Sequence, residues 1–404
     1  MNFLHQLLEK QRPLFAKGGK LERFYYVFEA LETFLFTPPT TTPARGVQIR
    51  DAIDLKRMMM TVVIALLPCL FYGMWNVGHQ HFLAIGQTAT FAEKFLLGFK
   101  LVLPIILVAY ASGGLVEVIF AIMRKHPINE GFLVTGMLIP LVMPVTIPLW
   151  QVALATVFAV LVAKEVFGGT GMNILNVALT ARAFLYFAYP TDISGSVWTY
   201  LGQEAKTVDG YSGATALAII AETSANLKSN FTHGAAVEAL NKVAWAPGLF
   251  SFENLFFGAI PGSIGETSTL MCLIGAAILI ITGVGSWKII LSVFAGAYLT
   301  GLLLNAFPLN AYMDLPAHYH LVIGGLAFGA VYMATDPVSA AHTETGKWIY
   351  GFLIGFFTIV IRVFNPAYPE GIMLAILLMN VFAPLIDYYV VQANKNRRLS
   401  RATV

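Results

Sequence analysis

The residues with the most evident chemical potential lie in a short polar run, Asp209-Gly210-Tyr211-Ser212-Gly213-Ala214-Thr215-Ala216. Thr215 offers a hydroxyl group that could be esterified to a phosphate. Its neighbours Gly213 and Ala214 are so small that a bulky group could approach the backbone beside it. A run of small residues is equally typical of a plain turn, so the run alone leaves both interpretations open.

Three carboxylates form a second set, because each falls within or beside an apolar stretch: Glu117, Asp336 and Asp387. An acid in hydrocarbon is costly, so each is a functional candidate by default. A hard cation such as sodium prefers oxygen ligands, and the Thr-Asp-Pro sequence at Asp336 would break a helix and free carbonyl oxygens beside the acid. The alternative is an ion pair with a buried base such as Arg182 or Arg362, or, for Asp387, an acid at the membrane interface.

The familiar cofactor and metal motifs do not occur in the sequence. It has no G-x-G-x-x-G after a strand, no Walker loop, no cysteine cluster for iron–sulfur and no paired-histidine pattern for haem. Cys69 and Cys272 lie in apolar runs without a partner at metal-ligand spacing, so we expect both to pack in the core. No metal site is expected apart from sodium, and a redox role would require an organic cofactor.

The elements that position these residues are membrane helices. Of the 404 residues, 57% are hydrophobic and 12% are charged, against about 25% charged in a soluble domain. Apolar runs that could cross about 30 Å of hydrocarbon recur along the chain, without the alternation of β-barrel strands. The sequence predicts an all-α polytopic membrane protein with about ten transmembrane helices, at residues 58–78, 101–123, 131–148, 150–167, 172–190, 268–284, 288–306, 319–335, 348–364 and 371–391.

The spans divide the chain into five regions. These are a cytoplasmic N-terminal arm (1–57), a first five-helix half (58–190), a polar periplasmic segment that carries Thr215 (191–267), a second five-helix half (268–391) and a basic cytoplasmic tail (392–404). The arm shows no cleavable signal, and with ten spans the basic loops fall on one side, which predicts both termini in the cytoplasm.

The tripeptide Val157-Phe158-Ala159 recurs as Val293-Phe294-Ala295, which favours two inverted five-helix repeats. The net charge of +3 is small, and the basic residues lie mostly beside helix ends, so no nucleic-acid partner is expected.

Several blocks resemble the B subunit of the bacterial Na(+)-translocating NADH:quinone reductases. Residues 212–215 look like the S-G-A-T flavinylation motif of that family, and further similar blocks lie at 124–126, 129–132, 163–171, 261–266, 333–340 and 365–371. Together they span almost the whole chain. The D subunit of the Rnf complex shares the motif and the membrane core but is expected to lack so long an N-terminal arm, so residues 1–57 favour the quinone reductase.

The resemblance implies a covalent cofactor on the polar run. FMN would be esterified through its phosphate to Thr215, with Asp209, Ser212, Gly213 and Ala214 beside the attachment point.

The resemblance also implies a noncovalent riboflavin among the helices, towards the cytoplasmic side. Our candidates for its site are Asn173, Asn176 and Thr135. The two asparagines are three residues apart at the start of the predicted helix 172–190, hence on one face, and carboxamides suit the donor and acceptor edge of an isoalloxazine ring. The alternative is an asparagine that caps this helix or joins two helices.

The function implied is that of a translocase subunit in the bacterial inner membrane. Electrons would pass from FMN to riboflavin and on to ubiquinone, coupled to sodium export. The partners would be other membrane and peripheral subunits of a complex of about six, so the chain is not expected to act alone. Gly113-Gly114 could form part of a quinone pocket, although close helix packing explains two glycines equally well.

Two other classes stay open at this point. A cofactor-free transporter built of inverted repeats would also have broken helices and buried acids, but would purify without flavin. A structural scaffold would have little use for buried carboxylates.

Overall fold

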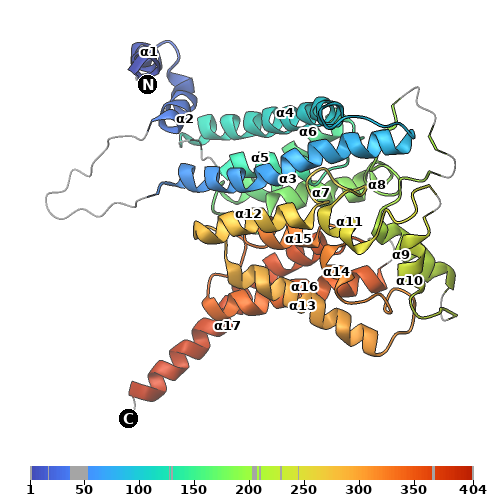
Figure 1. Ribbon diagram of the computed structural model, residues 1–404. Coiled ribbons are helices and arrows are strands. Elements are labelled where there is room, and N and C mark those ends of the chain that lie inside the picture. The colour runs from blue at the N-terminus through green and yellow to red at the C-terminus, as the bar shows by residue number, and fades with distance from the viewer. Residues whose placement is uncertain are drawn as a thin grey trace.

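The fold is a bundle of apolar helices, and no strand occurs among the residues that the structure describes. The computed structural model describes residues 2–16, 18–36, 53–126, 128, 131–202, 207–208, 211–227, 230–243, 245–365 and 369–402. Six helical segments in these ranges are long and apolar enough to cross a membrane (Figure 1). They are α3 (Leu55–Ala84), α4 (Phe91–Arg124), α6 with its π and 3-10 extensions (Leu149–Phe167), α13 (Trp287–Ala306), α16 (Glu344–Phe364) and α17 (Ile372–Ala402).

Four of the ten predicted spans lack a helix of 18 or more residues. Three contain only short helices: α5 (Gly131–Leu141), α7 (Val177–Ala188) and α12 (Thr269–Ile281). The fourth is divided into α14 (Tyr319–Val322), α15 (Leu326–Phe328) and a π-helical turn, η4 (Gly329–Met333). A 13-residue helix rises about 20 Å, less than the hydrocarbon thickness of about 30 Å. These segments therefore place irregular backbone inside the protein.

Other helix boundaries also differ from the prediction. Helix α4 begins at Phe91, ten residues before the predicted span, where Thr90 and Glu93 form a capping box. Helix α17 continues to Ala402, so the basic tail is helical as far as it is described. The N-terminal arm contributes α1 (Asn2–Phe15), a 3-10 turn (Glu22–Phe24) and α2 (Tyr25–Leu35), while residues 37–52 lie outside the described ranges.

Both chain ends lie at one end of the bundle in Figure 1, and α9 (Ala216–Leu227) and α10 (Ala235–Asn241) lie at the opposite end. The small helices α8 (Pro190–Ile193) and α11 (Phe252–Phe257) belong to the same polar segment as α9 and α10. Contacts tie the basic loops to the end with the termini: Tyr26 donates to the carbonyl of Lys125, and Lys288 pairs with Glu344. Which end faces the cytoplasm stays a prediction.

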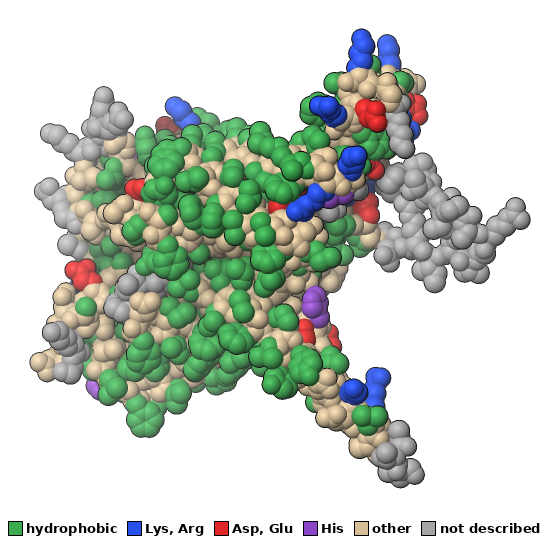
Figure 2. Space-filling view, turned by 180° about the vertical axis from the view of Figure 1, so that it is seen from behind, with side chains coloured by type: hydrophobic (Ala, Val, Ile, Leu, Met, Phe, Trp, Pro, Cys, Tyr) green, Lys and Arg blue, Asp and Glu red, His purple; other side chains and the backbone are tan. Residues whose placement is uncertain are grey.

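Apolar side chains dominate the lateral surface in Figure 2, and the basic residues gather at the end that carries the N-terminal arm and the C-terminal helix. Large hydrophobic side chains such as Phe91, Leu115, Ile281 and Leu303 are more than half exposed along this surface. A belt of this kind suits lipid as the surrounding solvent, because soluble proteins rarely expose so large an apolar area to water. The fold class predicted from the sequence is confirmed.

The two halves have matching packing partners. Helix α4 packs against α6 and α6 against α7, as α13 packs against α16 and α16 against α17. Helix α3 joins the halves by packing against both α4 and α12. Two repeats of five helices would give this pattern, and their inverted relation stays a prediction.

Glycines let α3 and α4 approach backbone to backbone. A Cβ at Gly98 would lie 1.7 Å from the carbonyl oxygen of Met74, and one at Gly78 would lie 1.9 Å from that of Lys94. Small residues at such crossings are the main means by which membrane helices associate closely.

We therefore expect Gly98→Ala to separate α3 from α4 and to lower the thermal unfolding midpoint in detergent. The overpacking cost should reach at least about 1–3 kcal/mol, since backbone rather than side chain must move. The matched control is Gly114→Ala, also in α4, where the nearest atom to a new Cβ is 3.9 Å away. Equal midpoints for the two variants would contradict the close crossing.

Candidate functional site

Two cavities contain most of the residues that the sequence singles out. The first, here called the motif cavity, has about 800 Å³ of empty space, part of which is open to solvent. It lies between α7, the loop after α8, the start of α9, the loop before α12, the break between α14 and α15, and the turn before α17. Its lining includes Arg182, Ser194, Trp198, Thr215, Ser263, Glu266, Gly324, Gly325 and Glu370.

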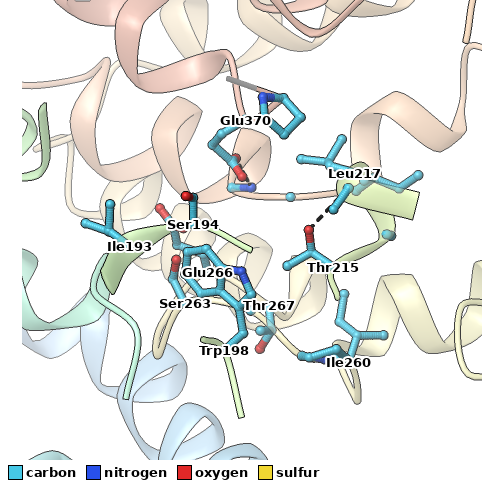
Figure 3. Close-up of a pocket in the computed structure, with 18 of the residues that line it drawn as sticks. Ile193, Ser194, Trp198, Thr215, Leu217, Ile260, Ser263, Glu266, Thr267 and Glu370 are labelled. Atoms are coloured by element: carbon cyan, nitrogen blue, oxygen red, sulfur yellow. Dashed lines mark hydrogen bonds between the residues drawn. The ribbon is translucent and has the colours of Figure 1, made fainter. Parts of the chain in front are cut away.

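Thr215 stands at the start of α9 and faces the motif cavity (Figure 3). Its hydroxyl oxygen accepts a hydrogen bond from the amide of Ala218 at 3.3 Å, as a helix N-cap does. Gly213 is buried with φ +62°, a conformation that glycine adopts without strain, so the turn before Thr215 requires a glycine. Ser212 is exposed and accepts from the amide of Ala214 at 3.4 Å. Asp209 lies outside the described residues.

A buried ion pair forms the opposite wall of the motif cavity. Arg182 of α7 lies 3.5 Å from Glu266, and its guanidinium also donates to the Ser263 hydroxyl at 2.9 Å. The guanidinium stands over the Trp198 ring, 5.6 Å from the centroid. Figure 3 shows Glu266, Ser263 and Trp198 grouped together, with Thr215 across the cavity from them. Sequence analysis named Arg182 only as a base for other acids, and it did not single out Glu266 or Ser263.

Glycine backbone forms a third side of the motif cavity, at Gly324 and Gly325. The amide of Gly325 donates to the Glu370 carboxylate at 2.5 Å. Arg362, fully buried, donates to the carbonyls of His320 and Ile323 at 2.8 and 2.9 Å. These bonds hold the break between α14 and α15 open, and a Cβ at Gly325 would meet the Glu266 carboxylate at 2.9 Å.

The second cavity, here called the asparagine cavity, has about 860 Å³ of open space and lies at the end of the bundle that carries the termini. The candidates Asn173, Asn176 and Thr135 all line it, together with Asp336. The structure therefore brings together four candidates from three distant parts of the sequence. Its other polar lining residues are Lys164, Thr170, Tyr332 and Thr335.

The two asparagines do not lie on a helix face, which corrects the sequence-based prediction. Helix α7 begins at Val177, because Gly168, Gly169 and Gly171 adopt positive φ in the loop before it. Asn176 is the N-cap of α7 and accepts from the amide of Leu179 at 3.1 Å, so the capping alternative is correct for this residue. Asn173 lies in the loop, where its amide donates to the carbonyl of Leu175 at 3.1 Å.

Beside the asparagine cavity, a second buried ion pair joins α4 to α6. Lys164 is 3% exposed and contacts Glu117, which is 6% exposed. Glu117 thus has a basic partner, as the ion-pair alternative foresaw, although the partner is neither Arg182 nor Arg362. Next to this pair, Arg124 lies 3.1 Å from Glu165. Each of these four charged side chains is therefore paired with one of opposite charge.

The remaining candidates make local contacts within the bundle. Asp387 of α17 accepts from the amides of His342 and Thr343 at 2.7 and 3.0 Å, which ties α17 to the start of α16. Asp336 accepts from the Ser339 hydroxyl at 2.7 Å. Gly113 and Gly114 line neither cavity: a Cβ at Gly113 would meet the Phe132 ring at 2.2 Å, so close packing explains this glycine.

Each cavity is lined by one residue that has a buried polar atom without a hydrogen-bond partner. In the motif cavity it is Glu266 Oε1, and in the asparagine cavity it is Thr170 Oγ1. A ligand with hydrogen-bonding atoms along an apolar body would satisfy both, whereas an apolar lipid tail would not. A multidentate metal site is not indicated, since no group of three or more metal-ligating side chains occurs within the described ranges.

Helix α7 connects the two cavities. Asn176, at its N-terminus, lines the asparagine cavity, and Arg182, six residues later, lines the motif cavity. At about 1.5 Å per residue, the two linings are separated by about 9 Å along this helix. The cavities are therefore close neighbours inside the bundle.

Comparison with known proteins gives consistent matches over nearly the whole chain. The model of the NQR2, RnfD, RnfE family matches residues 42–396. The chain is 48% identical to the B subunit of the Na(+)-translocating NADH-quinone reductase from Chromohalobacter salexigens, covering 98% of this chain and 96% of the relative. The corresponding B subunits from Klebsiella pneumoniae and Yersinia pestis are each 46% identical, over 98% of this chain and 99% of each relative.

The Lys164–Glu117 pair gives a test of the charge balance in this region. Lys164→Met should leave Glu117 buried without a partner and lower the free energy of unfolding by about 3–5 kcal/mol. The double variant Lys164→Met/Glu117→Gln should recover most of that loss, because no net charge is left buried. A double-mutant cycle from thermal unfolding midpoints measures the coupling. Additive losses from the two single changes would show that the pair does not form.

Proposed function

The chain belongs to the NQR2, RnfD, RnfE family, among the B subunits of Na(+)-translocating NADH-quinone reductases, and we propose that it carries electrons through two flavins in the membrane. FMN is esterified to Thr215 in the motif cavity, and riboflavin binds in the asparagine cavity. Flavins supply one-electron and two-electron transfer, and the protein supplies binding, orientation and electrostatics.

The observation that carries the proposal is the position of Thr215. Its hydroxyl lines a cavity of about 800 Å³ whose far wall holds a buried cation, a buried acid and an aromatic ring. A plain turn is not expected to face buried charged side chains. A phosphate on the Thr215 oxygen would also stand at the N-terminus of α9, where the amide of Ala218 already donates to that oxygen.

Arg182, Trp198 and Glu266 orient the ring of the covalent flavin in the motif cavity. The guanidinium supplies a fixed positive charge, and Trp198 offers a flat apolar face. Gly324 and Gly325 complete the lining of the cavity, where the space beside their Cα atoms is filled by the side chains of Leu217, Glu266 and Glu370.

Asn173, Thr135, Thr170 and Lys164 provide the polar contacts of the second flavin. Their positions around one cavity support this assignment, and Thr170 Oγ1 has no partner of its own there. Asn176 contributes mainly through the start of α7, which it caps.

The electrons leave to ubiquinone, and their passage is coupled to sodium export across the bacterial inner membrane. Glu117, Asp336 and Asp387 are the proposed acids of the ion pathway, and Gly113-Gly114 with the N-terminal arm are the proposed quinone contact. The termini face the cytoplasm and the Thr215 segment faces the periplasm. The partners are the other membrane and peripheral subunits of a hetero-oligomeric complex of about six, among them a flavin-bearing electron donor and an NADH-oxidising subunit.

A cofactor-free transporter is the second candidate function. The interrupted helices and the buried pairs Lys164–Glu117 and Arg182–Glu266 favour it as much as a redox subunit. An Rnf-type electron-transport subunit would carry the same covalent flavin. Flavin content separates the transporter from the other two.

Intact-chain mass spectrometry after denaturation tests the covalent site. The wild-type chain, made together with a flavin transferase, should carry an FMN-sized mass and fluoresce in a denaturing gel. Thr215→Ala should lose both signals completely, since no hydroxyl is left to esterify. Ser212→Ala, a matched loss of one hydroxyl in the same turn, should retain them. An unmodified wild-type chain would favour the transporter.

The noncovalent site predicts a second, separable flavin. Denaturation of the purified complex should release riboflavin in addition to the flavin that stays on the chain. Asn173→Leu should reduce the released riboflavin at least tenfold while leaving the covalent flavin unchanged, because only the asparagine cavity loses a polar contact. Chromatography of the extract measures the ratio. Unchanged riboflavin in this variant would remove Asn173 from the site.

A further inference from the structure

Glu266 differs from every other buried acid in the described ranges. Its side chain is 4% exposed, yet its Oε1 atom has no hydrogen-bond partner. The other oxygen, Oε2, lies 3.5 Å from Arg182. Burying a carboxylate oxygen without a partner is costly, so an atom left in this way is expected to meet something that the cavity receives.

The charges around Glu266 come from three elements packed against it. Arg182 of α7 favours the ionised form, and Glu370, before α17, opposes it. Arg362 of α16 lies near the same glycine backbone and within 3.9 Å of Glu370. The thiol of Cys272, one turn into α12, is a further titratable neighbour. Burial raises the pKa of the Glu266 carboxyl to about 7, although Arg182 acts in the other direction. The carboxyl is therefore poised between its two forms near neutral pH.

We infer that Glu266 is the proton acceptor of the motif cavity: where its carboxyl is ionised, it takes up one proton as the flavin on Thr215 gains one electron. This inference rests on the proposed function. The geometry supports it because the free oxygen of Glu266 belongs to a side chain that lines the same cavity as the Thr215 hydroxyl, beside the Arg182 guanidinium.

The step balances in charge and atoms. One electron arrives from a reduced flavin of a partner subunit, and one proton arrives from water at the mouth of the cavity, where Gly195 is exposed. The Glu266 carboxylate becomes a carboxylic acid, so the net charge of the cavity does not change. When the electron moves on, the acid returns its proton to water. Without this uptake, an added negative charge would face an ionised carboxylate in a medium of low dielectric constant.

The midpoint potential of the flavin on Thr215 should depend on pH in one direction only. Below about pH 7 the carboxyl is already protonated in the oxidised state, so reduction takes up no proton and the midpoint potential of the flavin stays constant. Above about pH 7 the carboxyl is ionised before reduction and protonated after it, so the potential falls as pH rises. The limiting slope is about 59 mV per pH unit for a one-electron couple.

Redox titration of the purified complex, followed by visible absorbance from pH 5.5 to 9, tests this step. The signal of the covalent flavin is isolated by subtraction of the Thr215→Ala complex. The wild type should show a flat region and then the slope, whereas Glu266→Gln should give a flat line at the acidic plateau, because glutamine resembles the protonated acid. Glu370→Gln is the matched control: it removes the carboxylate on the other side of Gly325 and should keep the slope.

Two results would overturn the inference. A slope that persists in Glu266→Gln would mean that the proton goes to the flavin itself or to another group, and a flat wild type would mean that no proton is taken up. The absence of covalent flavin from the wild type would instead overturn the proposed function, so the two failures are distinguishable.

If Glu266→Gln does not assemble, an infrared measurement on the wild-type complex alone still tests proton uptake. The reduced-minus-oxidised infrared difference spectrum at pH 8 should then show a new protonated-carboxyl stretching band that shifts in D₂O. Its absence would contradict proton uptake by a carboxylate.

Discussion

The structure depends on one constraint: a backbone group inside a bilayer must find its hydrogen-bond partner within the protein. The helix ends and breaks inside the bundle meet this need through contacts with other segments. The amides of Ile264 and Gly265 donate to the carbonyls of Met143 and Leu141, where the loop before α12 meets the end of α5. Arg362 satisfies carbonyls at the break between α14 and α15, and Asp387 satisfies amides at the start of α16. Hydrogen-bonded backbone groups and charged side chains therefore lie inside an otherwise apolar bundle.

The two cavities lie at these helix ends and breaks, so the same features that interrupt the helices form the proposed flavin sites. Helix α7 separates the cavities by about 9 Å between Asn176 and Arg182. Each cavity adjoins a buried pair of opposite charges, Lys164–Glu117 or Arg182–Glu266. A neutral pair can bind a ligand without an excess of buried charge, and it can respond to an added electron by moving a proton or a cation.

The sequence alone predicted the class of fold, the six long helices, and the polar run at Thr215, because apolar length and small polar residues are local signals. It did not predict every short helix: the run at 131–148 reads as continuous, since hydropathy does not register that α5 ends at Leu141, before Pro144. The structure places the candidates Asn173, Asn176 and Thr135 around one cavity, although the predicted position of the two asparagines on one helix face was wrong. Glu266 and the choice of Lys164 as partner of Glu117 required tertiary contacts, which the order of residues does not contain.

The measurement that bears most directly on the account is an experimental density map of the purified complex. The account predicts density continuous with the Thr215 oxygen, with a planar ring against Arg182, Trp198 and Glu266, and a second planar ligand between Asn173 and Lys164. A bare Thr215, a flavin whose ring lies outside the motif cavity, or cavities filled by lipid would contradict it.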